Sequence, residues 1–342
     1  DVERSRGLGD VYKRQAYNPV ANTIKFYEVT KPKTVAAIPL TSKGKFDKVF
    51  TPVSSETLSI SAKHDLQIFC LKFDDFDFDY HGLWKHLRNN IGYYVYSRAQ
   101  IKTYMEDDEI SALAYDAIAY IKKAISDGKL PTGNELGELL LYIFLEQVLG
   151  APKLMSKVEI GNHAGFMTSE SSGIHLLTAN EAVPFTQVIL GTSMINGDLQ
   201  TAIDSAFSDA QKLKSRKKDE RQFVESNIFA ASFPTKIYDQ LEAIILPSET
   251  GSQKPATAFG MFVGYSLSGV SASGKPVNEY QNDVLEQVRN DIKNNVSFIE
   301  SKITQYGLDG YSMYIYLLPF ADADEDKKDI MDKLLQSEGG QA

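Results

Sequence analysis

Acidic residues alternate with phenylalanine between Asp74 and Asp79. Clustered carboxylates are the ligands that hard cations such as Ca²⁺ take in proteins. The segment lacks the ligand spacing of a calcium-binding loop, however. A solvated edge or turn is therefore the favoured interpretation.

Two histidines are further candidates for a functional site. His175 follows Gly173 and Ile174 in a strand-like run and could contact a phosphate or a metal, although a hydrogen-bonded histidine inside a sheet is the favoured interpretation. His163 falls in a predicted loop, where simple exposure is expected. The chain contains no HExxH or CxxC spacing, so the sequence gives little support to a zinc site.

A basic run could contact DNA, because Lys and Arg provide affinity by neutralising backbone phosphates. Its members are Lys212, Lys214, Arg216, Lys217 and Lys218. A solvated helix end is the competing and favoured interpretation, and no aromatic RNA-binding motif accompanies the run. The formal net charge of −9 argues against nucleic-acid binding through the overall field, but it leaves room for a local basic groove.

The composition predicts an ordinary globular protein. The chain has 342 residues, 43% hydrophobic and 24% charged. No apolar run approaches the ~20 residues that span a bilayer, and the N-terminus lacks a secretory pattern. The single cysteine, Cys70, lies in an apolar run and is expected to be a buried thiol. Together these features predict a cytoplasmic protein with no membrane partner.

Three regions are expected along the chain. Residues 1–15 resemble a translated sequencing adapter and show no sustained helical or strand periodicity, so they are set aside from the fold argument. Residues 16–130 are predicted to form an N-terminal α+β region. Residues 131–342 are predicted to form the C-terminal domain.

The apolar pattern predicts the elements that must position any site. A strongly apolar helix is expected over 135–149, followed by strands over 154–160, 173–177 and 184–195 and a helix from 196. This helix–strand–strand–strand–helix order favours a mixed sheet with a helix on each side. Further strands are expected over 66–73, 257–266 and 311–318, and helices over 110–125, 278–303 and 325–335.

Several sequence blocks, in this order and spacing, resemble the HamA family (anti-bacteriophage protein A) of the Hachiman phage-defence system. The resemblance covers most of the chain from about Leu66 to Leu335. The blocks are Leu136–Tyr142, Leu149–Leu154, Ser172–Leu177, Ile189–Phe207, Ala258–Tyr265 and Tyr314–Phe320.

The resemblance implies an α/β fold of the PD-(D/E)xK nuclease type with a β-containing N-terminal elaboration, acting on DNA beside a superfamily-2 helicase, HamB. Nucleases of this type hold Mg²⁺ with two or three carboxylates; the metal activates water and stabilises charge on the phosphate. A nearby lysine positions the water and neutralises the phosphate.

By this resemblance, Glu138 matches the first acid of the family motif. The second acid is replaced by Ser172, and the strand-end acid and lysine are replaced by Thr192 and Met194. Neutral hydroxyls are poor ligands for a dication, and a thioether is soft and uncharged. The replacements therefore predict a defence subunit that is catalytically impaired and that senses DNA or regulates a helicase.

Two alternatives keep the chain an active Mg²⁺-dependent DNase. In the first, Glu159 or Glu170 joins Glu138 as a metal ligand. In the second, the residues read at the three replaced positions are sequence errors. A two-carboxylate site would require these acids and Lys157 to converge near Glu138, because metal–ligand bonds are only about 2 Å long.

Overall fold

A computed structural model describes residues 12–18, 23–29, 43–59, 64–127, 133–156, 158–159, 171–180, 183–215 and 255–336, together with residues 230, 232, 233, 235, 238, 239 and 241. The chain divides into two units, Asp1–Ala37 and Ile38–Ala342. In the first unit, β1 (Tyr12–Asn18) pairs antiparallel with β2 (Thr23–Val29). β1 therefore begins inside the segment for which the sequence predicted no regular structure.

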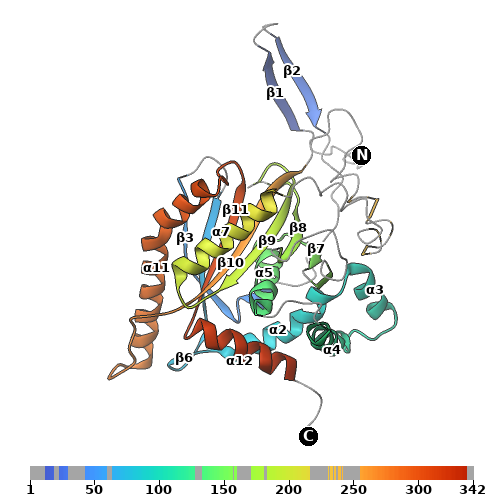
Figure 1. The fold of residues 1–342 in the computed structure, drawn as a ribbon. Coiled ribbons are helices and arrows are strands. Elements are labelled where there is room, and N and C mark those ends of the chain that lie inside the picture. The colour runs from blue at the N-terminus through green and yellow to red at the C-terminus, as the bar shows by residue number, and fades with distance from the viewer. Residues whose placement is uncertain are drawn as a thin grey trace, which may run out of the picture. The chain divides into compact units, whose positions relative to one another are not determined.

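The second unit is built on a mixed seven-stranded sheet (Figure 1). The strand order is β3 (Phe50–Glu56), β4 (His64–Leu71), β11 (Ser312–Phe320), β10 (Ala256–Ser266), β9 (Gln187–Ile195), β8 (Gly173–Leu177) and β7 (Lys153–Ser156). The four central strands, β4, β11, β10 and β9, are parallel. The remaining pairings are antiparallel.

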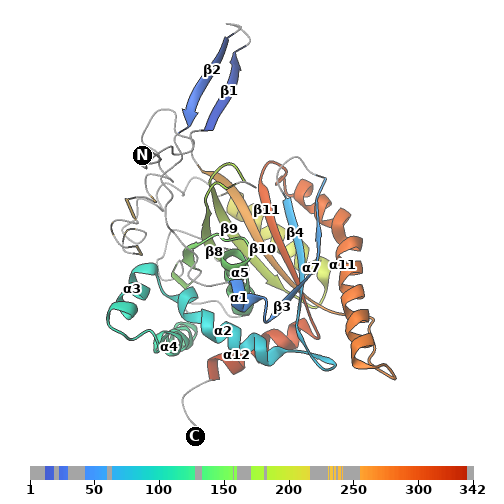
Figure 2. The same ribbon diagram turned by 180° about the vertical axis from the view of Figure 1, so that it is seen from behind.

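Helices cover both faces of this sheet, so the fold is α/β as predicted (Figures 1 and 2). On one face lie α7 (Leu199–Ser215) and α11 (Val277–Gln305). On the other face α5 (Glu135–Gln147) packs on β9 and β10, with α2 (Tyr80–Val95) and α12 (Ala323–Gln336) beside it. The elements α3 (Arg98–Glu106) and α4 (Leu113–Ser126) extend this second layer.

The centre of the α5 layer is an aromatic cluster around Phe144. Its ring lies 5.1 Å from that of Phe69 on β4, 5.2 Å from Tyr316 on β11 and 5.6 Å from Phe262 on β10. The short helix α1 (Lys43–Phe46) adds Phe46, whose ring is 5.0 Å from that of Phe144. Burying such side chains contributes roughly 1.5–3 kcal/mol each, which explains why α5 is rich in large apolar residues.

At the edge of the same layer, α2 and α12 meet around Trp84. The Arg88 guanidinium and the Lys333 ammonium each lie 5.5 Å from the centroid of the Trp84 ring. The His81 ring stacks at 6.2 Å. The contact of Lys333 with Trp84 joins α12 to α2.

The acidic run Asp74–Asp79 forms a hairpin, as its interpretation as a turn predicted. β5 (Phe73–Asp74) pairs with β6 (Asp77–Phe78), and Asp75 adopts a positive φ of 53°. Asp79 then caps α2 by accepting a hydrogen bond of 2.7 Å from the Gly82 amide. The carboxylates of this run therefore belong to the hairpin and to the N-terminal cap of α2.

One expected strand is wrong in its second half: β7 ends at Ser156, and Val158 and Glu159 are helical. The Ser156 hydroxyl accepts a hydrogen bond of 3.2 Å from the Glu159 amide, and Glu159 Oε2 accepts one of 2.8 Å from the Ser156 amide. This reciprocal pairing is a capping box, which starts a helix. The Ser-x-x-Glu spacing that signals it is present in the sequence.

Candidate functional site

Glu138 lies in the first turns of α5, after Asn134 at the helix N-terminus. Acidic side chains are favourable at this end of a helix, because the unpaired amides give it a partial positive charge. Glu138 is half-buried, since α5 is enclosed by β9 on one side and by α2 and α12 on the other. The helix therefore holds the carboxylate at the margin of the core.

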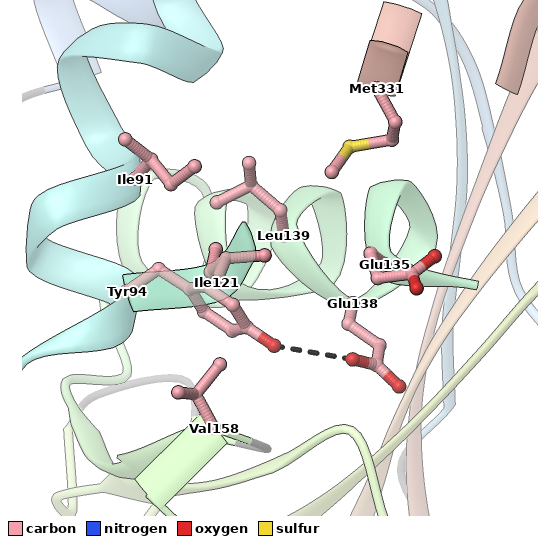
Figure 3. A pocket seen from close by; sticks show the side chains of 8 residues that line it. All are labelled: Ile91, Tyr94, Ile121, Glu135, Glu138, Leu139, Val158 and Met331. Carbon is pink, nitrogen blue, oxygen red and sulfur yellow. Dashed lines mark hydrogen bonds between the residues drawn. The ribbon is translucent and has the colours of Figure 1, made fainter. Parts of the chain in front are cut away.

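The Glu138 carboxylate faces Tyr94 on α2, whose hydroxyl donates a hydrogen bond of 3.3 Å to Glu138 Oε2 (Figure 3). Burial and the nearby Glu138 charge both raise the pKa of Tyr94, so this phenol stays neutral and acts as a donor. The two side chains line a cavity of about 10 Å³, the space of roughly one water molecule. The rest of its wall is largely apolar, formed by Ile91, Ile121, Glu135, Leu139, Val158 and Met331.

Three neutral polar side chains meet beside the first turn of α5: Asn134, Ser172 and Ser193. Asn134 Nδ2 donates to the Ser193 hydroxyl at 2.9 Å and to the Ser193 carbonyl at 2.7 Å. The hydroxyls of Ser172 and Ser193 lie 2.9 Å apart and share a hydrogen bond. This Asn134–Ser172–Ser193 cluster carries no charge and satisfies its own hydrogen bonds.

Glycines allow α5 to approach the strand this closely. A Cβ atom on Gly191 would lie 2.8 Å from Leu141 Cδ2, and one on Gly137 would lie 3.2 Å from Ser193 Oγ. Any larger residue would push the helix away from β9. The contacts also show that Gly191 and Ser193 point toward α5.

The other motif residues on β9 point the opposite way. Successive side chains of a strand alternate between faces, so Thr192 and Met194 lie on the α7 face while Ser193 lies on the Glu138 face. Thr192 is fully buried there, and its hydroxyl has no hydrogen-bond partner among the described residues. The structure therefore brings Ser172, but neither Thr192 nor Met194, onto the face that carries Glu138.

Glu159, considered above as a substitute ligand, belongs to a buried ion pair. Its Oε2 lies 2.9 Å from Lys153 Nζ, and the two side chains are 8% and 1% exposed. Lys153 Nζ also donates to the carbonyls of Tyr94 and Tyr96 at the end of α2, at 2.9 and 2.8 Å. Burial lowers the pKa of Lys153, and Glu159 acts in the opposite direction. Glu159 thus already has a partner that holds it in place.

A second carboxylate, Glu146 of α5, completes this buried region. Its Oε1 accepts a hydrogen bond of 2.8 Å from the Lys153 amide and lies 3.7 Å from Arg98 Nη2. Because Lys153, Glu159 and Glu146 are all buried, their role is to join the edge of the sheet to α2 and α5. Apolar periodicity gives no signal for such a network.

His175 lies inside the sheet, as its position in an apolar strand predicted. Its Nδ1 lies 2.8 Å from the Ala151 carbonyl, and the side chain is 2% exposed. Burial lowers its pKa to about 3. The imidazole is therefore neutral at physiological pH and donates to the carbonyl through Nδ1.

Of the basic run, the structure describes Lys212 and Lys214 at the end of α7. Lys212 Nζ pairs with Asp209 at 2.8 Å, and Lys214 Nζ donates to the Gly307 carbonyl at 2.6 Å. Lys212 is exposed and Lys214 is half-buried, and both make contacts within the chain. The other three members, Arg216, Lys217 and Lys218, lie outside the described residues, as do Lys157, His163 and Glu170.

The carboxylates that the structure describes do not assemble a metal site: no three His, Cys, Asp or Glu side chains among the described residues are placed to hold an ion. Sequence reasoning found Glu138 and Ser172 but missed Asn134, Ser193 and Tyr94. Ser193 could have been found from strand alternation once Gly191 was assigned to the α5 contact. Tyr94 lies on an element distant in sequence and gave no local signal.

A family model, HamA, matches residues 47–334. The match covers most of the second unit, including the strands and helices that carry Glu138, Ser172 and Ser193. A search of the curated proteins found no match. Within the described part of the chain, no helix is long and apolar enough to cross a membrane.

Proposed function

Because the chain belongs to the HamA family, we propose that it is an anti-phage defence subunit with a PD-(D/E)xK nuclease-like fold and an incomplete nuclease centre. Membership in this family suggests an anti-phage defence protein. In this proposal the chain senses DNA or regulates a superfamily-2 helicase instead of cutting DNA itself.

The Asn134–Ser172–Ser193 cluster is the observation that supports this proposal. A metal-dependent nuclease needs two or three carboxylates around its ion, because the metal must be held while it activates water. Beside the first turn of α5 the chain instead presents an amide and two hydroxyls that hydrogen-bond to one another. Glu135, the other acid on the wall of the Glu138 cavity, accepts a hydrogen bond of 2.8 Å from the Gly133 amide. Neutral oxygens alone are weak ligands for Mg²⁺, which prefers carboxylates.

Mg²⁺ would supply nucleophile activation and charge stabilisation if it were bound. The described residues do not fit it: Glu138 is the one acid at the four motif positions, and Glu159 is paired with Lys153. We therefore assign Glu138 the role of accepting the Tyr94 hydrogen bond at the end of α5.

The first test is cleavage of plasmid and oligonucleotide DNA with Mg²⁺ or Mn²⁺, with and without a cognate superfamily-2 helicase. The wild-type chain and Glu138→Gln should be equally inactive. Metal-dependent cutting that Glu138→Gln abolishes would overturn the proposal and favour an active DNase that uses Glu138 with Glu159 or Glu170.

Two reversion variants sharpen this test. The motif reversion is Ser172→Asp, Thr192→Glu and Met194→Lys. The structure-based reversion is Ser172→Asp with Ser193→Glu, which places both acids on the Glu138 face. If β9 is oriented as described, the second should bind Mn²⁺ more tightly in calorimetry, whether or not it regains cleavage, because it places three carboxylates on the Glu138 face and the first places two.

The same samples test DNA sensing by fluorescence anisotropy of a labelled duplex. Neutralising the basic run, with Lys212, Lys214, Arg216, Lys217 and Lys218 changed to Gln, should weaken binding and flatten its salt dependence. The matched control is Lys102→Gln with Lys293→Gln, exposed lysines outside the run. Equal binding by both variants would remove the basic run from the proposal.

A further inference from the structure

Large hydrophobic side chains are concentrated at one exposed corner of the second unit. Among the described residues four such side chains are exposed, and three of them fall within the corner Met105–Tyr115, which joins α3 to α4. Met105 is 54% exposed, Ile110 37% and Tyr115 57%. The fourth, Phe185, lies outside this corner, just before the start of β9 in the sequence. Clustering of this kind marks interaction sites more often than scattered exposure does.

The corner is held in a defined conformation. The Tyr104 hydroxyl of α3 donates a hydrogen bond of 2.7 Å to Asp116 of α4. Asp108 adopts a positive φ of 59°, and the Glu109 amide donates to the Tyr104 carbonyl at 2.8 Å. A surface that is already ordered loses less entropy on binding, so its apolar anchors contribute more to affinity.

Acidic residues lie between the apolar anchors. Glu106, Asp107, Asp108 and Glu109 are consecutive and exposed, and only one cation, Lys102, is paired with them in the described ion pairs, 3.2 Å from Glu106. This charge repels a nucleic-acid backbone. It also disfavours a second copy of the same chain, whose formal net charge is −9.

We propose that the Met105–Tyr115 corner is a protein-docking surface for a partner that offers an apolar pocket rimmed by lysine and arginine. Met and Tyr are typical interface anchors, and acidic residues at the rim guide a basic partner into register. The inference rests on the proposed function in one respect: the partner used to test it is the superfamily-2 helicase named in that proposal.

The experiment measures binding of the full-length chain to that helicase by biolayer interferometry at two salt concentrations. Met105→Ser with Tyr115→Ser should weaken binding at least tenfold, mainly through faster dissociation. Asp107→Asn with Glu109→Gln should slow association and reduce its salt dependence. Both sites are exposed, so circular dichroism should show folded proteins.

Phe185→Ser is the matched control for the apolar change and Glu325→Gln for the charge change, and neither should alter binding. Wild-type affinity in both corner variants would overturn the docking surface while leaving the proposed function intact. Absence of binding by the wild-type chain would overturn the helicase role and the docking proposal together. DNA binding that the corner variants lose would also contradict the docking proposal.

Discussion

Which face of β9 a side chain occupies decides whether it can join Glu138. Ser193 points toward α5 and hydrogen-bonds to Asn134, whereas Thr192, one residue earlier, is buried against the α7 layer. Both hydroxyls are buried, but that of Ser193 is hydrogen-bonded and that of Thr192 has no partner among the described residues. A buried hydroxyl without a partner is a cost to the folded state, and a paired one is not.

This difference predicts stability changes of opposite sign. Thr192→Val should raise the free energy of unfolding by about 1 kcal/mol, because it removes an unpaired buried hydroxyl and keeps the side-chain shape. Ser193→Ala should lower it by about 1–2 kcal/mol, because Asn134 loses an acceptor. Urea unfolding measures both. The orientation of β9 described here would be wrong if Ser193→Ala were the more stable variant.

At the scale of elements, strands and helices with strong apolar patterns could be predicted from the sequence. The strand 173–177 matches β8 in full, and the expected long helix matches α11 within two residues at each end. The helix α3 gave no such signal, because Ile101 is its only residue that is buried. Its start is fixed by a capping box between Ser97 and Gln100, a side-chain feature that periodicity does not detect.

The candidate site was only partly predictable for the same physical reason. Glu138 and Ser172 lie next to apolar runs that the sequence marks clearly. The face of β9 on which Thr192 and Met194 lie is set by the contact of Gly191 with Leu141, which is a tertiary contact. The pairing of Lys153 with Glu159 likewise depends on the carbonyls of α2, far away in the sequence.

Two buried histidines, one in α2 and one in β8, make these elements sensitive to acid. Burial lowers the pKa of His86 to about 4 and that of His175 to about 3. In the unfolded chain both protonate near pH 6.5. Between those values the unfolded state binds more protons, so the protein should lose stability as the pH falls below 6.5.

Each histidine should remove about 1.4 kcal/mol of stability per pH unit in this window. The measurement is the free energy of unfolding between pH 7 and pH 5, above the range in which ordinary carboxylates titrate. His175→Gln should reduce the slope by about half, and the exposed His81→Gln should leave it unchanged. A pH-independent wild-type stability would contradict the burial of both histidines.

Over the whole of the second unit, one continuous core runs through the sheet and includes the single cysteine. Cys70 is fully buried on β4, between β3 and β11, and burial raises its pKa to about 12. The thiolate, which is the reactive form, is therefore scarce in the folded protein. Access to this thiol requires the sheet to open.

Labelling of Cys70 should therefore report opening of the sheet. At pH 8, reaction with a thiol reagent should be at least about a thousandfold slower in native buffer than in guanidinium chloride, as expected for a core with ordinary stability. The label can be followed by mass spectrometry. Rapid labelling of the native chain would mean that β3 separates readily from β4.

The contact between α2 and α12 also gives the protein an optical property. Trp84 is the only tryptophan in the chain, and its indole lies beside Arg88 of its own helix and Lys333 of the last helix. The tryptophan fluorescence of the protein therefore comes from a single place. Its emission reports whether α12 is docked on α2.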